Sequence, residues 1–235
     1  MRTLYIIPAR GGSKRIPKKN IKLLGGKPLI YYSIDFARKF AQDEDICVST
    51  DCEEIINAVE SYGLNIPFIR PSELSSDSSG THDVLMHAFE FFVRKGRYYD
   101  AILLLQPTSP FRLEQHLKEV WNIYTPDIDM VVSVSESHQN PYFNLFEESE
   151  LGFLKKSKNG KFASRQEIPA VYCYNGSLYL INTKSLLEQP LHTFRRVKKY
   201  VMDDLYSVDI DTPLDWVIAE VILDRNIITF NNKVS

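Results

Sequence analysis

Cysteine is scarce in this chain, with three residues among 235, at positions 47, 52 and 173. None of them forms a C-x-x-C pair, so the sequence predicts neither a disulfide framework nor a zinc knuckle. The simplest interpretation is that all three thiols stay reduced, which is typical of a cytoplasmic protein. The five histidines show no H-x-x-x-H or other metal-ligand spacing, so we assign none of them to metal binding or catalysis.

Long apolar runs and an excess of charge of either sign are also missing. No stretch approaches the roughly 18 consecutive apolar residues that a membrane-spanning helix requires. The apolar run near the N-terminus lacks the length of a secretory signal and an A-x-A cleavage site. With 28 basic and 30 acidic residues, the formal net charge is −2, which argues against a nucleic-acid coat protein. We therefore expect neither a membrane nor a nucleic acid as a partner.

What is present is an ordinary globular composition, with 44% hydrophobic and 25% charged residues. Strand-like and helix-like segments alternate over residues 1–135, and strands separated by helices predict an α/β fold with a mostly parallel sheet covered on both faces. Short apolar runs predict strands at 4–7, 46–48, 68–69, 101–105 and 130–134. Apolar residues at helical spacing predict helices over 30–41, 55–62, 85–92, 113–124 and 214–222. Gly63 is expected to end the second of these helices.

The pattern changes between residues 136 and 205. Aromatic residues there alternate with polar ones, as in Tyr-Phe-Asn-Leu-Phe over 142–146, and 155–161 is a basic turn that contains glycine. Alternation of this kind indicates strands with one exposed face. We expect residues 136–205 to form a β-rich insertion within a single domain that covers residues 1–235.

A loop rich in glycine and cations, residues 9–20, follows the first predicted strand. It reads Ala-Arg-Gly-Gly-Ser-Lys-Arg-Ile-Pro-Lys-Lys-Asn, which is neither a Walker A motif nor a G-x-G-x-x-G fingerprint. Gly11 and Gly12 allow backbone N–H groups to approach an anion, and Arg10 and Lys14 supply charge. The pattern fits a polyphosphate cradle and a solvated basic loop about equally well.

Asp209 and Asp211 stand two residues apart near the end of the chain. On a strand both carboxylates would point to one face, and Mg²⁺ usually takes one or two carboxylates together with substrate phosphates. Helix capping is the alternative, and Thr212, Pro213 and Asp215 already fit a cap with proline at the first helical position. Because capping leaves Asp209 and Asp211 unexplained, the pattern favours a metal site.

Two further loops follow predicted strands, at 70–81 and 106–112. Ligands bind at the carboxyl ends of parallel strands, so we expect these loops to lie close to the loop at 9–20. The run Gln-Pro-Thr-Ser-Pro at 106–110 offers an amide and two hydroxyls, although it also fits a connection stiffened by proline. Asp51, after the second predicted strand, is interpreted as a cap of the helix that follows.

These motifs resemble, in number, order and spacing, those of the acylneuraminate cytidylyltransferases, the CMP-sialic acid synthetases. The resemblance spans residues 5 to about 224. It is carried by Ile-Pro-Ala-Arg-Gly-Gly-Ser-Lys-Arg-Ile-Pro-Lys-Lys-Asn (7–20), Ser49-Thr50-Asp51, Arg70-Pro71, Gln106-Pro107-Thr108-Ser109-Pro110 with Arg112, Arg165-Gln166, Asn175-Gly176 with Tyr179, and Asp209-Ile210-Asp211-Thr212. It implies a Rossmann-like nucleotidyltransferase fold and a homodimer in which the insertion pairs with the other subunit and contributes to its site.

The resemblance also implies the reaction, in which CTP and a nine-carbon 2-keto acid sugar give a CMP-sugar and pyrophosphate with Mg²⁺. The anomeric 2-hydroxyl of the sugar would attack the α-phosphorus in line. The implied catalytic residues are Arg10, Lys19, Asp209 and Asp211, the two aspartates as metal ligands. The implied nucleotide-binding residues are Ala9, Arg10, Gly11, Ser13, Lys14, Lys19, Asn20, Arg70, Ser79 and Thr81. The implied sugar-binding residues are Gln106, Arg165 and Tyr179.

One departure concerns the sugar. Bacterial sialic acid synthetases carry a lysine shortly after a proline near the start of the insertion, whereas residues 139–144 read Gln-Asn-Pro-Tyr-Phe-Asn. This pattern is similar to that of relatives that activate legionaminic acid. The alternatives are activation of another acid sugar, such as pseudaminic acid or Kdo, and binding of a cytidine nucleotide without catalysis.

Overall fold

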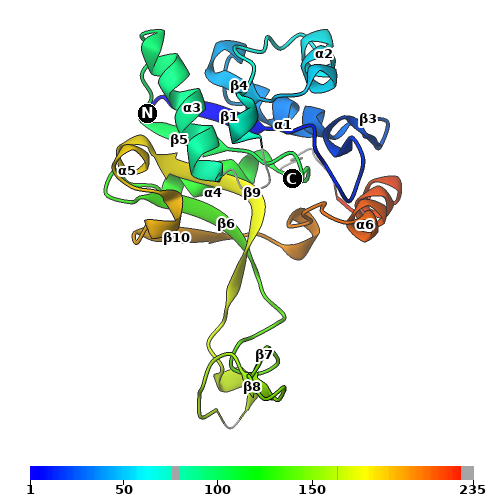
Figure 1. Ribbon diagram of the computed structural model, residues 1–235, viewed down its shortest axis with the longest axis vertical. Helices are drawn as coiled ribbons and strands as arrows, with labels where there is room; N and C mark the ends of the chain where they lie inside the picture. Colours follow the sequence, from blue (N-terminus) through cyan, green and yellow to red (C-terminus); the bar gives the residue numbers. More distant parts are fainter. Residues whose placement is uncertain (76–79, 163, 229–235) are drawn as a thin grey trace, which may run out of the picture.

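The computed structural model describes residues 1–75, 80–162 and 164–228 (Figure 1). Its centre is a six-stranded sheet in the order β10-β6-β9-β5-β1-β4. The strands are β1 (Thr3–Pro8), β4 (Ile46–Ser49), β5 (Ala101–Leu104), β6 (Met130–Glu136), β9 (Tyr172–Asn182) and β10 (Val197–Val201). Only β9 runs antiparallel to its neighbours in this sheet. The mostly parallel sheet predicted from the sequence is therefore confirmed.

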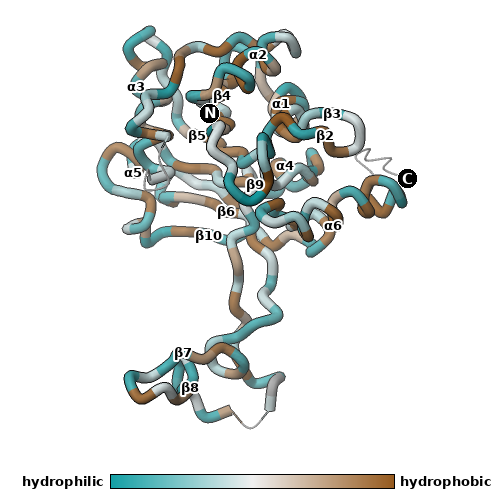
Figure 2. Tube along the Cα trace, turned by 45° about the vertical axis from the view of Figure 1, so that its right-hand side comes forward, coloured by the Kyte–Doolittle hydropathy of each residue, from teal (hydrophilic) through white to brown (hydrophobic). Residues whose placement is uncertain are grey.

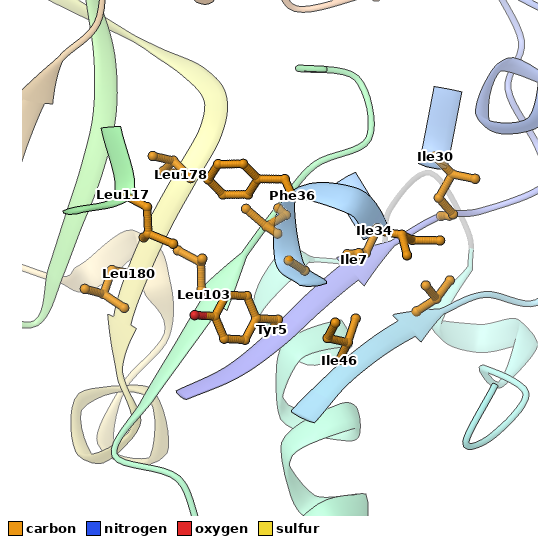
Figure 3. Close-up of a cluster of buried hydrophobic side chains, with 14 of the residues drawn as sticks. Tyr5, Ile7, Ile30, Ile34, Phe36, Ile46, Leu103, Leu117, Leu178 and Leu180 are labelled. Atoms are coloured by element: carbon orange, nitrogen blue, oxygen red, sulfur yellow. The ribbon is translucent and has the colours of Figure 1, made fainter. Parts of the chain in front are cut away.

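Helices cover both faces of the sheet. They are α1 (Leu29–Arg38), α2 (Glu53–Ser61), α3 (Thr81–Arg94), α4 (Glu114–Ile123), α5 (Thr183–Glu188) and α6 (Pro213–Asp224). Apolar residues of α1, α2 and α4 pack on one face, and those of α3 and α5 pack on the other. In β1, Tyr5 and Ile7 point into the first cluster (Figure 3) and Leu4 and Ile6 into the second. Burial of both faces explains the continuous apolar run of this strand.

Short elements complete the body of the molecule. Two glycines with positive φ, Gly25 and Gly26, join β2 (Leu23–Leu24) to β3 (Lys27–Pro28). A third apolar cluster lies under α6 and includes Ile210 and Trp216. The 3-10 helices are η1 (Lys19–Ile21), η2 (Asp43–Asp45), η3 (Ser72–Leu74), η4 (Arg165–Glu167), η5 (Leu191–Thr193) and η6 (Asp204–Tyr206). Within the described part of the chain, every helix is too short or too polar to cross a membrane.

Residues 137–171 form an arm that leaves the body between β6 and β9 and projects far from it (Figure 1). Its regular structure includes a hairpin of β7 (Phe146–Glu148) and β8 (Leu154–Lys156). The predicted bounds of the insertion, 136–205, are too wide, because β9 and β10 both belong to the main sheet. The aromatic alternation at the start of β9 continues into a buried stretch of the same strand, and the sequence pattern alone does not mark that transition.

The strand predicted at Phe68-Ile69 is also wrong. Ile69 makes a single parallel bridge to Thr50, beyond the end of β4. Pro67 and Pro71 flank this pair, and a residue without a backbone N–H cannot extend a ladder. The predicted end of α2 is confirmed, because the helix stops at Ser61 and Gly63 follows with φ +79°.

Candidate functional site

A cleft of about 670 Å³ opens at the carboxyl ends of β1 and β5. Each of the three loops that the sequence predicts to converge contributes to its wall, with Arg10, Arg70 and Gln106 as examples. Asp209 and Asp211 line the same cleft from the segment before α6. The cations of the wall are Arg10, Lys14, Arg15, Lys19 and Arg70. A wall with five cations and two carboxylates suits a polyanion bound together with a metal ion.

The basic loop at 9–20 is anchored to the body rather than merely solvated. The Ala9 N–H donates to the Ser49 carbonyl (2.9 Å), and the Asn20 side chain donates to the Arg10 carbonyl (3.0 Å). Asn20 is buried. A Cβ at Gly11 would lie 2.8 Å from the Cβ of Cys52, so only glycine lets the loop approach α2 this closely. This fixed course favours the cradle over the solvated loop.

Asp51 is not the helix cap that the sequence predicts. The N-cap position of α2 is Cys52, whose N–H donates to the Thr50 hydroxyl (3.2 Å). Asp51 Oδ1 instead accepts from the Gly11 N–H (3.2 Å) and lies 3.7 Å from Arg70 Nη2. Asp51 therefore ties the basic loop to the wall of the cleft. Its position at the end of a parallel strand was the signal that could have revealed this role.

Arg70 presents unsatisfied donors to the cleft. The residue is 5% exposed, and its Nε and Nη2 have no hydrogen-bond partner among the described residues. Burial lowers the pKa of its guanidinium, while the nearby Asp51 carboxylate raises it. Buried donors without partners cost free energy, so a bound molecule with acceptor atoms would stabilise this wall.

The segment that carries Asp209 and Asp211 has no regular secondary structure. The Ile210 N–H donates to the Thr108 carbonyl (2.8 Å), and the Ile210 side chain packs in the apolar cluster under α6. The two aspartates that flank Ile210 both line the cleft. The predicted cap is confirmed, with Thr212 and Asp215 forming a capping box at α6.

The two carboxylates differ in environment. Burial raises the pKa of Asp209, although a hydrogen bond from Thr108 opposes the shift. Asp209 Oδ1 is buried and has no hydrogen-bond partner in the described part of the chain. Asp211 is exposed, and its Oδ1 lies 2.9 Å from Lys19 Nζ, which also donates to the Ile210 carbonyl (2.7 Å). A buried carboxylate oxygen without a partner beside a second carboxylate fits a divalent cation.

No cluster of three or more histidine, cysteine, aspartate or glutamate residues suited to a metal occurs over residues 1–75, 80–162 and 164–228. Two carboxylates without further protein ligands are the complement that Mg²⁺ takes when substrate phosphates fill its remaining positions. The structure therefore fits a metal that arrives with a phosphorylated ligand better than it fits a permanently held ion.

Gln106 lines the cleft together with Asp209, whereas Tyr179 is not among the lining residues. A Cβ at Gly176 would lie 2.7 Å from Gln106 Oε1 and 2.6 Å from Ser109 Oγ, and Gly176 has φ +72°, so glycine is required there. Burial, and after it the charge of Asp209, raises the pKa of Tyr179 to about 12. Gly176 thus lies close to both the Gln106 amide and the Asp209 carboxylate, and the raised pKa keeps the Tyr179 phenol neutral.

Arg112 holds the backbone that carries Gln106 in place. Its buried guanidinium donates to the carbonyls of Gln106 (2.6 Å) and Ser177 (3.0 Å) and to the Ser33 hydroxyl (3.0 Å). Burial lowers its pKa to about 9, and the charge of Asp209 opposes that shift. The sequence predicts no role for Arg112. Its contacts join segments that are distant along the chain, and such contacts leave no pattern in the neighbouring residues.

Of the remaining predicted site residues, some line the cleft and others do not. Ser13, Lys14 and Thr81 line the cleft, whereas Ala9 lies behind it as part of the anchored loop. Arg165 belongs to η4 in the arm, and its side chain lies outside the described part of the structure. Ser79 lies outside the described residues.

Comparison with known proteins agrees with this geometry. A family model described as cytidylyltransferase matches residues 4–224. The CMP-N,N'-diacetyllegionaminic acid synthase of Legionella pneumophila is 34% identical over 96% of this chain and 98% of its own length. The pseudaminic acid cytidylyltransferase of Campylobacter jejuni is 31% identical over 96% of this chain and 98% of its own. The N-acylneuraminate cytidylyltransferase of Streptococcus agalactiae is 33% identical over the whole chain, which spans 57% of that longer protein.

Among solved structures, CMP:2-keto-3-deoxy-manno-octonic acid synthetase complexed with CTP superposes with a TM-score of 0.67 at 16% identity. The match covers 96% of this chain and all of the other. At that identity the likeness concerns the fold, which is the Rossmann-like nucleotidyltransferase fold that the resemblance of the motifs implies. With the family model matching nearly its entire length, the chain belongs to the cytidylyltransferase family.

Proposed function

We propose that this protein transfers CMP from CTP to the anomeric hydroxyl of a nine-carbon 2-keto acid sugar. In the reaction the sugar oxygen forms a bond to the α-phosphorus, the bond from the α-phosphorus to the bridging oxygen breaks, and pyrophosphate leaves. The observation that carries the proposal is the single cleft in which five cations face the Asp209–Asp211 pair beside Gln106. The names of the full-length relatives agree with this reaction.

The cations would bind the triphosphate. Arg10, Lys14 and Lys19 stand on the anchored loop, where Ala9, Gly11 and Ser13 contribute the backbone. The unsatisfied donors of Arg70 suit the acceptor atoms of a cytosine base, with Asn20 and Thr81 nearby in the same cleft. Catalysis would then consist of positioning and charge neutralisation, with little covalent chemistry by the protein.

Asp209 and Asp211 would hold Mg²⁺, which, when bound, supplies neutralisation of the triphosphate charge. In the structure described here Lys19 pairs with Asp211. Since Lys19 is also a phosphate ligand in this proposal, it would exchange a carboxylate for a phosphate when CTP binds. The buried oxygen of Asp209, which has no such partner among the described residues, is the stronger metal ligand of the two.

The sugar that we propose is an N-acylated nonulosonic acid of the legionaminic type. Its support is the similarity to the Legionella pneumophila enzyme and the Asn-Pro-Tyr-Phe-Asn run at 140–144, which lacks a lysine. The Campylobacter jejuni relative makes pseudaminic acid the second candidate. The test is pyrophosphate release with CTP and Mg²⁺ over legionaminic, pseudaminic, N-acetylneuraminic and Kdo acids, with ATP, GTP and UTP as controls. Release with none of the four acids would contradict the proposal.

We also propose a homodimer in which the arm of each subunit completes the site of the other. The arm exposes Leu151, Phe153 and Leu154 by 83%, 72% and 71%, and a lone hairpin with exposed apolar side chains is marginally stable in water. The carboxylate of an acid sugar suits a cationic partner, and in this proposal Arg165, on η4 of the arm, serves the site of the other subunit. Because CTP is a cytoplasmic metabolite and the three cysteines are unpaired, we place this dimer in the cytoplasm.

Complementation between subunits tests the shared site. Arg165→Ala leaves the cleft intact, and Asp209→Asn leaves the arm intact, so each variant alone should be nearly inactive. In co-expressed mixtures, half of the dimers would combine one intact cleft with one intact arm, which restores about a quarter of the wild-type rate for a two-fold dimer. Failure to restore activity, with both variants folded, would contradict the shared site without affecting the proposed reaction.

A further inference from the structure

Asn175, in β9, is the centre of a buried polar network. The residue is 3% exposed. Its Oδ1 accepts from Ser133 Oγ (2.6 Å) and from the Ser177 N–H (3.2 Å), and its Nδ2 donates to Ser207 Oγ (3.0 Å). Its backbone carbonyl accepts from Ser109 Oγ (2.9 Å). One residue thereby joins β6, β9 and two segments that have no place in the main sheet.

Those two segments carry the chemistry of the site. Ser109 stands three residues after Gln106, and Ser207 stands two residues before Asp209. A backbone hydrogen bond from the Ile210 N–H to the Thr108 carbonyl (2.8 Å) joins the same two segments directly. Asn175 itself is not among the residues that line the cleft. Any effect it has on the reaction must therefore pass through the segments that it holds.

The neighbouring geometry leaves little freedom for these segments. Gly176 follows Asn175, and a Cβ there would lie within 2.7 Å of Gln106 Oε1 and 3.4 Å of the Asp209 carboxyl carbon. β9 pairs with β6 on both sides of this point, with a shift in register between Val132 and Val134. A bulge of this kind redirects side chains beside active sites. At this interruption the Ser177 N–H donates to Asn175 Oδ1 (3.2 Å), and the Leu178 N–H donates to Ser133 Oγ (2.7 Å), which itself donates to Asn175.

We propose that Asn175 is a positioning residue of the transfer reaction, which holds the Gln106 loop against the Asp209 segment so that sugar and metal ligands face each other. The inference rests on the proposed function, because it assigns the sugar to Gln106 and the metal to Asp209. Both segments are loops, and a buried network fixes such loops only when all of its members are satisfied. Loss of the amide leaves Ser133 and Ser207 without that partner and loosens the Asp209 segment. The bond from Ser109 Oγ to the Asn175 carbonyl remains, so the Gln106 loop is affected through its contact with that segment, the bond from the Ile210 N–H to the Thr108 carbonyl.

Asn182 provides a matched control in the same strand. It is also buried, at 6% exposure, and its Nδ2 donates to the carbonyls of Pro126 (2.9 Å) and Ile128 (3.3 Å). Its Oδ1 accepts from the Lys184 N–H (2.9 Å) and so caps α5. Both asparagines make comparable numbers of buried hydrogen bonds, but those of Asn182 lie at the opposite end of β9.

The experiment compares Asn175→Ala with Asn182→Ala in the full-length protein. We expect both to lose stability, but only Asn175→Ala to raise the sugar KM and the Mg²⁺ requirement, each by about tenfold or more, as is typical for residues that orient metal ligands. The Kd of CTP measured with EDTA by calorimetry should change less than about twofold, because Asn175 does not contact the loops of Arg10 and Arg70. Equal kinetic constants in the two variants would overturn the proposal.

A readout without substrate separates this inference from the proposed function. In the unliganded protein, the Ile210 amide should exchange its hydrogen at least about tenfold faster in Asn175→Ala than in Asn182→Ala, because local opening is easier. If Asn175→Ala does not fold, Ser207→Ala removes one bond of the network and should shift exchange and Mg²⁺ requirement in the same direction. Unchanged Ile210 exchange would overturn the proposal. Absence of turnover in the wild type would contradict the proposed function and leave the exchange result to decide whether Asn175 holds the two segments.

Discussion

In β5 every residue is buried, whereas in β7 and β8 every residue is exposed. Leu180 of the body has no exposed surface, and Leu154 of the arm is 71% exposed. Figure 2 shows hydrophobic residues in both regions, so hydropathy alone does not separate them. The body buries most of its apolar residues within the chain, although α6 exposes Leu214 and Val217, and the hairpin of the arm holds its apolar residues on the surface. This difference supports the proposal that the arm contacts a second subunit.

The same comparison applies to polar groups. In the body, buried polar atoms such as Asn175 Oδ1 have fixed partners, and the unsatisfied atoms at the cleft are Arg70 Nε, Arg70 Nη2 and Asp209 Oδ1. Since a buried polar atom without a partner costs about 1–3 kcal/mol, these atoms mark where binding recovers free energy. Other buried atoms without a described partner, such as Trp121 Nε1 and Ser177 Oγ, belong to residues that do not line the cleft, so only part of this set points to a ligand.

The largest effect is expected from Asp209→Asn, which removes the buried charge from the cleft. Turnover should fall on the order of 10³-fold. The folded protein should not lose stability, because burial raises the pKa of Asp209 and the neutral amide avoids that burial of charge. Steady-state kinetics and thermal unfolding check both statements. Asp224→Asn, at the exposed end of α6, is the control, and a lower melting temperature for Asp209→Asn would contradict the account.

A matched pair of leucines tests the contrast between body and arm directly. Leu180→Ala should lower the free energy of unfolding by about 2–5 kcal/mol, because it opens a cavity in a closed core. Leu154→Ala should lower it by less than about 0.5 kcal/mol in dilute protein, yet weaken self-association. Urea unfolding and sedimentation velocity measure the two quantities. Equal losses of stability would mean that the arm is packed on the body in solution.

A pH effect of intermediate size is expected from His116 in α4. Burial lowers its pKa to about 4 from 6.5, and its Nδ1 accepts from the Leu113 N–H (3.3 Å). The folded state therefore excludes a proton that the unfolded state binds below pH 6.5. Neutral His116 therefore makes its full contribution to the free energy of unfolding above pH 6.5. This contribution is lost as the pH falls toward 4, which lowers the free energy of unfolding by about 2–3 kcal/mol.

Urea unfolding between pH 7 and pH 4.5 measures this contribution. His116→Gln should flatten the decline in stability over that window. His138→Gln changes a histidine of the arm whose side chain is 87% exposed, and it should leave the decline as in the wild type. A decline of equal slope in wild type and His116→Gln would assign the acid sensitivity to other groups.

The smallest effect is expected on the surface of the body itself. Arg94 and Glu90 form an i,i+4 ion pair on α3 (3.7 Å) with side chains 69% and 54% exposed. Arg94→Ala should change the free energy of unfolding by less than about 0.5 kcal/mol, and less still in 1 M salt. Thermal unfolding at two salt concentrations checks this. A loss above 1 kcal/mol would show that burial does not set the hierarchy of effects proposed here.

Much of the fold follows from short-range patterns. The apolar runs predict β1, β4, β5 and β6, and the run Thr-Pro-x-Asp predicts the start of α6 with its capping box. The cation-rich loop and the Asp209–Asp211 pair also stand out as short motifs. These features depend on residues within a few positions of one another, and for that reason the sequence alone locates them.

Other features depend on contacts between distant segments. Asp51 meets Gly11 across 40 positions, and Lys19 meets Asp211 across 192. The residues around Asp51 in the sequence fit a helix cap and an anchor of the basic loop equally well. The bounds of the arm depend on β9 inserting antiparallel between β5 and β6, which is a property of strand order rather than of hydropathy.

The sequence by itself determined the class of fold, the three loops of the candidate site and the Asp209–Asp211 pair, because periodicity and motif spacing are local properties of the chain. Only the tertiary structure decided that Asp51, Arg112 and Asn175 support those loops. The physical reason is that burial and strand order select among many long-range contacts which the same local patterns allow.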